Sequence, residues 1–164
     1  MPENSLNLFP LPIHLFLFLI QATYKTTKSG YIFYGLDIRM DSGTVSRFNV
    51  VLKINDGQGI PCQLKRHLSP ITVGMIMRML PLKGNAHQIG ESIIYFETNV
   101  NSGIERKKTD FKRGDIAFLP AEGSVCFYTN DVSNGKPMTP IGKIDKIEKL
   151  ITVKPSDILL LTRN

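Results

Sequence analysis

The stretch GDIAFLPAEGSVCFYT, residues 114–129, decides the fold that we predict for this chain. Ile116–Leu119 and Ser124–Thr129 are short runs rich in apolar and aromatic residues, which is typical of strands. Pro120–Gly123 lies between them and has the composition of a tight turn, because proline fixes φ and glycine tolerates a positive φ. The stretch therefore predicts two strands joined by a short turn.

Further strand patterns lie on both sides of this stretch. Residues 47–54 alternate between apolar and other side chains, and the turn signal at 56–59 predicts a hairpin with Ile60–His67. Additional strands are predicted at Ser92–Thr98, Pro140–Ile147 and Ile158–Thr162. Seven or so short strands predict a closed or nearly closed β-barrel, because closure removes exposed sheet edges.

One substantial helix is predicted between these strands. Ser69 and Pro70 are typical of a helix start, with serine as the N-cap and proline at the first helical position. Apolar residues follow at helical spacing until Pro81 ends the run: Val73, Ile76, Met77 and Leu80. The methionines of this segment suggest either an adaptable binding face or core packing, and core packing is favoured. A second, short helical turn is predicted at Glu148–Val153.

Composition limits the class of protein. The chain has 164 residues, 42% hydrophobic and 21% charged, which excludes a disordered or collagen-like protein. Lys and Arg number 20 against 14 Asp and Glu, and the net charge of +6 permits an anionic partner without demonstrating one. Two cysteines exclude a dense disulfide framework and a four-thiolate zinc site.

The first 39 residues differ in character from the remainder. Leu8–Ile20 is nearly all apolar, yet shorter than the roughly 20 residues that span a bilayer. A signal peptide ending near Ala22 fits poorly, because no positive charge precedes the apolar run. Three interpretations stay open: translation that begins at Met40, a signal or membrane anchor, and a genuine extension. We divide the chain into an apolar extension, 1–39, and a barrel domain, 40–164.

Four segments carry a resemblance to a known family. They are Gly90–Phe96 (GESIIYF), Gly114–Pro120 (GDIAFLP), Val125–Tyr128 (VCFY) and Pro140–Ile144 (PIGKI). In this order and spacing, across roughly residues 45–163, they resemble the cyclophilin-like domain of uncharacterised prokaryotic proteins. The resemblance implies a mainly β fold, a cyclophilin-like closed β-barrel with one main α-helix and a short second helical turn.

The resemblance supports a shared fold more strongly than it supports a shared enzymatic activity. True cyclophilins isomerise prolyl bonds with an arginine in a Phe-His-Arg-Val motif, followed by a Gln-Gly-Gly segment. The corresponding strand here, SIIYFET at 92–98, has no arginine, and no such segment is present. Tryptophan, which often lines the groove of the enzymes, is absent from the chain. The resemblance therefore implies a retained fold without the catalytic set, and no catalytic residue is assigned.

The predicted function is a module that binds a peptide or small ligand in an apolar groove, without efficient prolyl isomerase activity. The groove is expected to be lined by Tyr95, Phe118, Phe127 and Tyr128, with residues 130–139 as one rim. Tyr95 and Phe96 are neighbours on one strand, so their side chains point to opposite faces, and Phe96 is expected inside. No metal or cofactor is expected, and the protein is predicted to be cytoplasmic.

Two alternatives stay open. A prolyl isomerase could use a displaced catalytic arginine from another strand, such as Arg66. A nucleic-acid-associated domain could use the cations of 106–113, but this segment holds one aromatic residue, Phe111, and a solvated loop is favoured. A membrane partner is expected only if residues 1–39 belong to the native protein.

A few histidine, glutamate and cysteine side chains are candidates for reactive groups. His87 and Glu91 are four residues apart, a spacing that aligns metal ligands on a helix, and His67 is a further candidate for the same set. The glycines on either side of His87 predict a loop, so a structural coincidence is favoured. Cys62 and Cys126 lie in apolar strand patterns and are predicted to be small core residues rather than nucleophiles.

Overall fold

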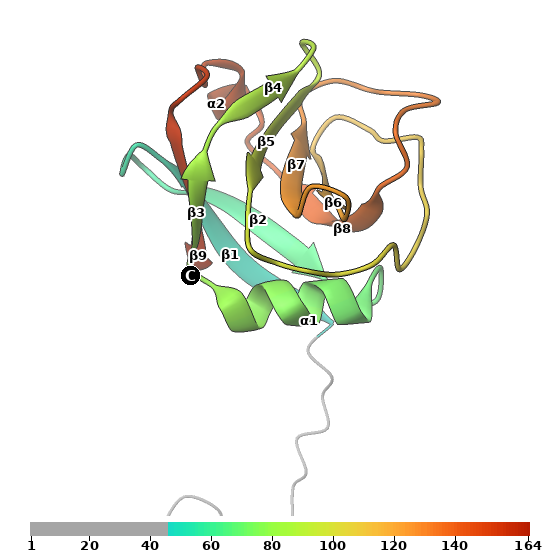
Figure 1. Cartoon of the computed structure of the whole chain (residues 1–164). Helices are drawn as coiled ribbons and strands as arrows, with labels where there is room; N and C mark the ends of the chain where they lie inside the picture. Colours follow the sequence, from blue (N-terminus) through green and yellow to red (C-terminus); the bar gives the residue numbers. More distant parts are fainter. Residues whose placement is uncertain (1–45) are drawn as a thin grey trace, which may run out of the picture. The chain divides into compact units, whose positions relative to one another are not determined.

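The computed structural model describes residues 46–164, so the predictions for residues 1–39 lie outside the described part of the chain. This part contains nine strands and two helices (Figure 1). In chain order they are β1 (Arg47–Ile54), β2 (Ile60–Lys65), α1 (Pro70–Met79), β3 (Leu82–Asn85), β4 (His87–Ile89), β5 (Ile93–Glu97), β6 (Asp115–Leu119), β7 (Ser124–Tyr128), β8 (Thr139–Ile144), α2 (Glu148–Ile151) and β9 (Ile158–Arg163). The predicted main helix and second helical turn are confirmed.

The nine strands form one antiparallel sheet in the order β3-β9-β1-β2-β8-β6-β7-β5-β4. Its two outermost strands, β3 and β4, follow one another in the chain with only Ala86 between them. One short run of chain therefore pairs with β9 through its first half and with β5 through its second half. The sheet curls round on itself in this way, and the predicted β-barrel is confirmed (Figure 1).

The run β3–β4 closes the barrel, and we call it the closing run. Its structure corrects one prediction. The glycines near His87 predicted a loop, whereas β3 and β4 are both strands. Their side chains are mostly exposed and show no apolar alternation, so the local pattern contains no strand signal. Pairing with β9 and β5 supplies the backbone hydrogen bonds that the sequence pattern does not indicate.

The barrel interior is filled by the side chains that alternate inward along the strands. Phe96 and Phe127 stack there with ring centroids 6.4 Å apart, and Phe96 is buried as predicted. Other fully buried members of this core are Leu52, Ile60, Leu64, Ile76, Phe118 and Leu159. Cys62 belongs to the same core, which confirms the prediction made for it.

Helix α1 begins at Pro70 and ends before Pro81, as predicted, and it lies along one end of the barrel (Figure 1). Its N-cap residue, Ser69, directs its hydroxyl to the Pro140 carbonyl at 2.8 Å and leaves the helix N-terminus uncapped. Glu105 supplies the cap instead, because its carboxylate accepts the N–H groups of Ile71 and Thr72, each at 2.9 Å. Val73 and Ile76 are buried, and Met75 and Met77 pack against the core.

We expect Glu105→Gln to lower the free energy of unfolding by about 1 kcal/mol at neutral pH, the usual value of a helix cap. Burial raises the pKa of Glu105, but the hydrogen bonds from Ile71 and Thr72 lower it more, so the pKa lies below its ordinary value. The carboxylate therefore stabilises the fold above the unfolded-state pKa and loses this contribution as the pH falls through the folded-state pKa.

Urea titrations of both proteins between neutral and acidic pH would measure this difference. The gap between wild type and Glu105→Gln should close as the pH falls. Glu97→Gln is the matched control, since the Glu97 carboxylate makes no hydrogen bond within residues 46–164, and it should leave stability nearly unchanged. A pH-independent gap would contradict the capping role of the Glu105 carboxylate.

Candidate functional site

The four residues expected to line a groove lie on opposite faces of the sheet formed by β5, β7 and β6. Phe118 and Phe127 point into the barrel core and are fully buried. Tyr95 and Tyr128 belong to the outer face, where a second, smaller apolar cluster lies. The structure therefore brings together the two tyrosines and separates them from the two phenylalanines.

Two chain segments cover much of the outer face. Residues 108–111 and 132–138 are joined by isolated backbone bridges, Lys108 to Met138 and Phe111 to Val132. We call these segments the outer cover. Residues 130–139, which were expected to form one rim of a groove, therefore contribute to this cover.

The outer cover packs directly on Tyr128. The Phe111 ring stacks on the Tyr128 ring with centroids 4.4 Å apart, and the Tyr128 hydroxyl donates to the Met138 sulfur at 3.3 Å. Burial raises the pKa of Tyr128 well above its ordinary value. Phe111, the single aromatic residue of the basic segment, is thus a core residue and offers no surface for stacking with a base.

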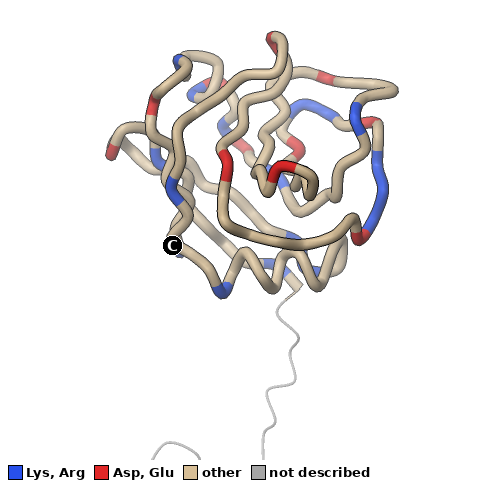
Figure 2. The backbone as a smooth tube through the Cα atoms, viewed as in Figure 1, with Lys and Arg blue, Asp and Glu red and all other residues tan. Residues whose placement is uncertain are grey.

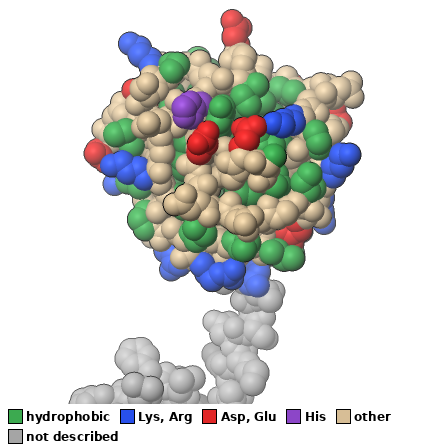
Figure 3. Space-filling model, viewed as in Figure 1, with side chains coloured by type: hydrophobic (Ala, Val, Ile, Leu, Met, Phe, Trp, Pro, Cys, Tyr) green, Lys and Arg blue, Asp and Glu red, His purple; other side chains and the backbone are tan. Residues whose placement is uncertain are grey.

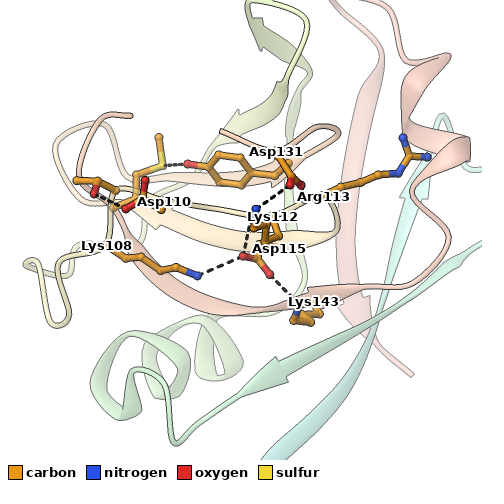
Figure 4. A network of polar contacts seen from close by, with 10 residues as sticks. Lys108, Asp110, Lys112, Arg113, Asp115, Asp131 and Lys143 are labelled. Carbon is orange, nitrogen blue, oxygen red and sulfur yellow. Dashed lines mark hydrogen bonds and ion pairs between the residues drawn. The ribbon is translucent and has the colours of Figure 1, made fainter. Parts of the chain in front are cut away.

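A charge network around Asp115 holds the outer cover in place (Figure 4). The Asp115 carboxylate contacts the ammonium groups of Lys108 at 3.3 Å and Lys143 at 3.0 Å, and accepts the Lys112 N–H at 3.0 Å. Burial raises the pKa of Asp115, but these donors and cations lower it more, so its pKa lies below the ordinary value. Asp131 accepts from the side chain of Lys112 at 2.9 Å. Lys108, Lys112 and Lys143 are therefore partnered within the fold.

Tyr95 remains partly accessible beside the outer cover. It lies opposite His87 across β4 and β5, with ring centroids 5.3 Å apart. His87 is in β4 and Glu91 is in the turn that follows, so these two residues do not share a helix. Within residues 46–164 no three His, Cys, Asp or Glu side chains gather closely enough to hold a metal ion.

A cleft of about 390 Å³ opens beside this region, and we call it the end cleft. It is bounded by the β4–β5 turn, the residues after β7, and helix α2, and its lining is Gln88, Gly90, Glu91, Ile93, Ile94, Thr129, Asn130 and Ile151. Its size falls within the range of small-molecule sites, about 300–1,000 Å³. Sequence reasoning missed it, because its lining comes from β4, β5, the turn between them, the residues after β7 and a short helix, which only the closed barrel brings together.

Internal hydrogen bonds fix the shape of the end cleft. The Thr129 hydroxyl and the Asn130 side-chain amide both donate to the Glu91 carbonyl, at 3.0 and 3.2 Å. The Gln88 amide donates to the Val153 carbonyl at 2.9 Å, which links β4 to the segment after α2. These bonds use the amide N–H groups and leave the amide oxygens of Gln88 and Asn130 as acceptors that a ligand can meet.

Neither cysteine is reactive, and Arg66 lies at the opposite end of the barrel from the end cleft. Burial raises the pKa of the Cys62 and Cys126 thiols to about 12, so neither forms a thiolate at neutral pH. Arg66 is exposed and directly follows β2, and its N–H donates to the Ser46 carbonyl. The end of β2 lies beside α1, whereas the β4–β5 turn and α2 lie at the other end of the barrel (Figure 1).

A family model described as the Cyclophilin-like family matches residues 69–160, which is more than half of the chain. The chain belongs to the cyclophilin-like family. The match includes α1, the closing run β3–β4 and both tyrosines of the outer face. The resemblance stated from sequence is thereby confirmed for the family and the fold.

Two solved structures share the cyclophilin-like fold of this chain. A hypothetical protein from Archaeoglobus fulgidus is 21% identical, with 73% of this chain and 96% of that chain covered and a TM-score of 0.58. The protein McbB, solved in complex with tryptophan, is 12% identical, with 70% of this chain and 44% of McbB covered and a TM-score of 0.60. No curated protein is similar in sequence. No helix within residues 46–164 is long and apolar enough to cross a membrane.

Proposed function

We propose that this cyclophilin-like chain is a binding module that takes a peptide or a small ligand in the end cleft and along the Tyr95 side of β5. The observation that carries the proposal is the continuity of the two surfaces. Ile93 lines the end cleft, and Tyr95 lies two residues further along the same face of the same strand. A ligand seated in the cleft can therefore extend onto the rings of Tyr95 and His87.

The lining of the end cleft suits a ligand with an apolar body and polar groups at its edge. Ile93, Ile94 and Ile151 provide apolar surface that a ligand removes from water on binding. The amide oxygens of Gln88 and Asn130 are acceptors at the rim, and such groups orient a ligand rather than supply most of its affinity.

A binding role without efficient isomerisation agrees with the side chains that β5 offers. Lowering the barrier to prolyl rotation requires a positioned hydrogen-bond donor for the peptide group. The outer face of β5 carries Ile93, Tyr95 and Glu97, and none of these side chains is a cation. Arg113, whose guanidinium lies 3.4 Å from the Thr129 carbonyl, forms an ion pair with Glu148 at 3.0 Å.

The other three residues predicted to line the groove are Phe118, Phe127 and Tyr128. In this proposal they support the site as buried residues. Phe127 pairs with Ile94 across β5 and β7, and so supports the floor of the end cleft. Tyr128 pairs with Ile93 in the same way, and Phe118 packs in the core below them. Direct contact of these side chains with a ligand stays a prediction.

Titration of the isotope-labelled protein with N-acetyl-leucinamide, N-acetyl-prolinamide and a proline-containing tetrapeptide would test the proposal. We expect backbone amide signals of Gly90, Glu91, Thr129 and Asn130 to shift with at least one probe. Ile151→Trp should weaken the response about tenfold by filling the end cleft, while Ile104→Trp, at an exposed isoleucine elsewhere, should leave it unchanged. Shifts that avoid the end cleft, or acceleration of prolyl isomerisation to the level of an ordinary cyclophilin, would contradict the proposal.

A further inference from the structure

The basic residues of the protein divide into a partnered and an unpartnered group. Within residues 46–164, all five salt bridges involve cations between Lys108 and Lys143, each facing Asp115, Glu122, Asp131 or Glu148. A second group of cations takes part in none of these bridges: Arg47, Lys65, Arg66, Arg78, Arg106 and Lys107. Six further cations also take part in none of these bridges: Lys53, Lys83, Lys146, Lys149, Lys154 and Arg163. They are matched in number by the carboxylates that lie outside the bridges and the α1 cap, which are Asp56, Glu91, Glu97, Asp110, Asp145 and Asp157. The second group therefore carries most of the net positive charge of residues 46–164.

These unpartnered cations share one end of the barrel, and we call this surface the α1 end. Arg47 pairs with Lys65 where β1 begins and β2 ends, and Arg66 follows on the way to α1. Arg78 lies in the last turn of α1. Figure 2 shows a basic position near the end of α1 and others beside the helix, and Figure 3 shows basic side chains gathered along the lower edge of the molecule.

The start of α1 brings the remaining two cations to the same surface. Arg106 and Lys107 directly follow Glu105, which caps the helix. The carboxylate of Glu105 is engaged by the helix N-terminus and also interacts electrostatically with Arg106, so this one acid offsets part of the charge of the two cations. The α1 end thus presents cations from four separate segments of the chain around one helix.

Large apolar side chains protrude among these cations. Ile71 is 64% exposed, Ile104 is 53% exposed and Met79 is 40% exposed. Ile71 and Met79 are eight residues apart on α1, so they lie on the same side of the helix, and Ile104 neighbours the Glu105 cap. Apolar side chains within a ring of cations are typical of a surface that rests on a charged bilayer interface.

We propose that the α1 end is a docking surface for an anionic phospholipid bilayer. The cations would meet lipid headgroups, while Ile71, Ile104 and Met79 would enter the interfacial layer. Nucleic acid fits this surface less well, because base stacking requires exposed aromatic rings, and the aromatic residue beside Arg47, Phe48, packs against the barrel core. The end cleft lies at the other end of the barrel from α1, so a docked protein keeps it open to solvent.

Co-sedimentation of the full chain with vesicles would test this docking. Vesicles of phosphatidylcholine alone are compared with vesicles that also contain phosphatidylserine, and the ratio of the two partition coefficients is the readout. Each basic residue near an anionic surface raises the partition coefficient about fivefold. We therefore expect R106E/K107E to lower the ratio by about 25-fold or more, and I71S/I104S to weaken binding to the anionic vesicles several-fold.

K146E/K154E is the matched control, because both lysines are exposed and lie outside the α1 end. It makes the same change in net charge and should keep most of the preference for anionic vesicles. The apolar run Leu8–Ile20 is present in every variant, so its own partitioning cancels in the ratio. Equal binding of the wild type to both vesicles, or an equal loss in the control, would overturn the proposal. Binding that depends on Arg106 and Lys107 but occurs only with an oligonucleotide would overturn it in favour of nucleic acid.

Discussion

Gly142→Ala is expected to lower the free energy of unfolding by about 3 kcal/mol or more, the upper range for overpacking a core. Gly142 lies in β8, where it pairs with Leu64 of β2 on one side and with Ile116 of β6 on the other. A Cβ at this position would meet the Gln63 carbonyl oxygen and the Leu64 Cα. Both are backbone atoms, so no side chain can rotate away, and the β2–β8 ladder must separate instead.

Urea unfolding followed by circular dichroism would measure the effect of Gly142→Ala. Gly103→Ala is the matched control, because a Cβ there would meet nothing within 4 Å and the backbone φ is ordinary. The control should be neutral or stabilise by about 0.4–1 kcal/mol, since alanine restricts the unfolded chain more than glycine does. Equal effects of the two substitutions would show that β8 tolerates a wider spacing from β2 than this structure has.

The second large effect is expected for Phe111→Ala, which removes the aromatic centre of the outer cover. Truncating a buried phenylalanine costs about 3–5 kcal/mol. Phe111 loses its stacking on Tyr128 and its contact with Lys108, whose ammonium lies 4.8 Å from the ring centroid. Because burial raises the pKa of Tyr128, opening the cover should also lower that pKa toward its ordinary value.

Absorbance of tyrosinate against pH, together with urea unfolding, would measure both consequences of Phe111→Ala. Phe111→Leu is the control, because it keeps an apolar side chain over Tyr128 and should lose clearly less stability. Val132→Ala removes a smaller part of the same cover and should have a smaller effect on both readouts. An unchanged Tyr128 titration in a folded Phe111→Ala protein would mean that the outer cover does not keep water from the tyrosine.

The strands that sequence reasoning predicted are those with an apolar signature of their own. In β1 apolar side chains alternate with others, and in β7 a continuous run of apolar and aromatic residues is buried at every position. The run β3–β4 escaped prediction because its residues are short, polar or glycine, and its strand conformation depends on partners distant in the sequence. Barrel closure is a tertiary property, so its strand need not have a local signature.

The candidate site was predictable only in part, for a related reason. The alternation of side chains along β5 distinguished Tyr95 from Phe96 correctly. The alternation does not show which face of the sheet a loop covers. Phe111 was therefore interpreted as one aromatic residue within a solvated basic segment. The end cleft depends on Ile93 and Ile151 meeting across separate elements, which no spacing in the sequence expresses.

The position of β9 has a consequence for how the protein is made. β9 is the last strand in chain order within residues 46–164, yet it lies between β1, the first, and β3. While the chain is being synthesised, β1 and β3 each keep an unpaired edge until Ile158–Arg163 have left the ribosome. A nascent chain that stalls before this point exposes two unpaired strand edges at once, so it can misassemble with other chains until β9 has emerged.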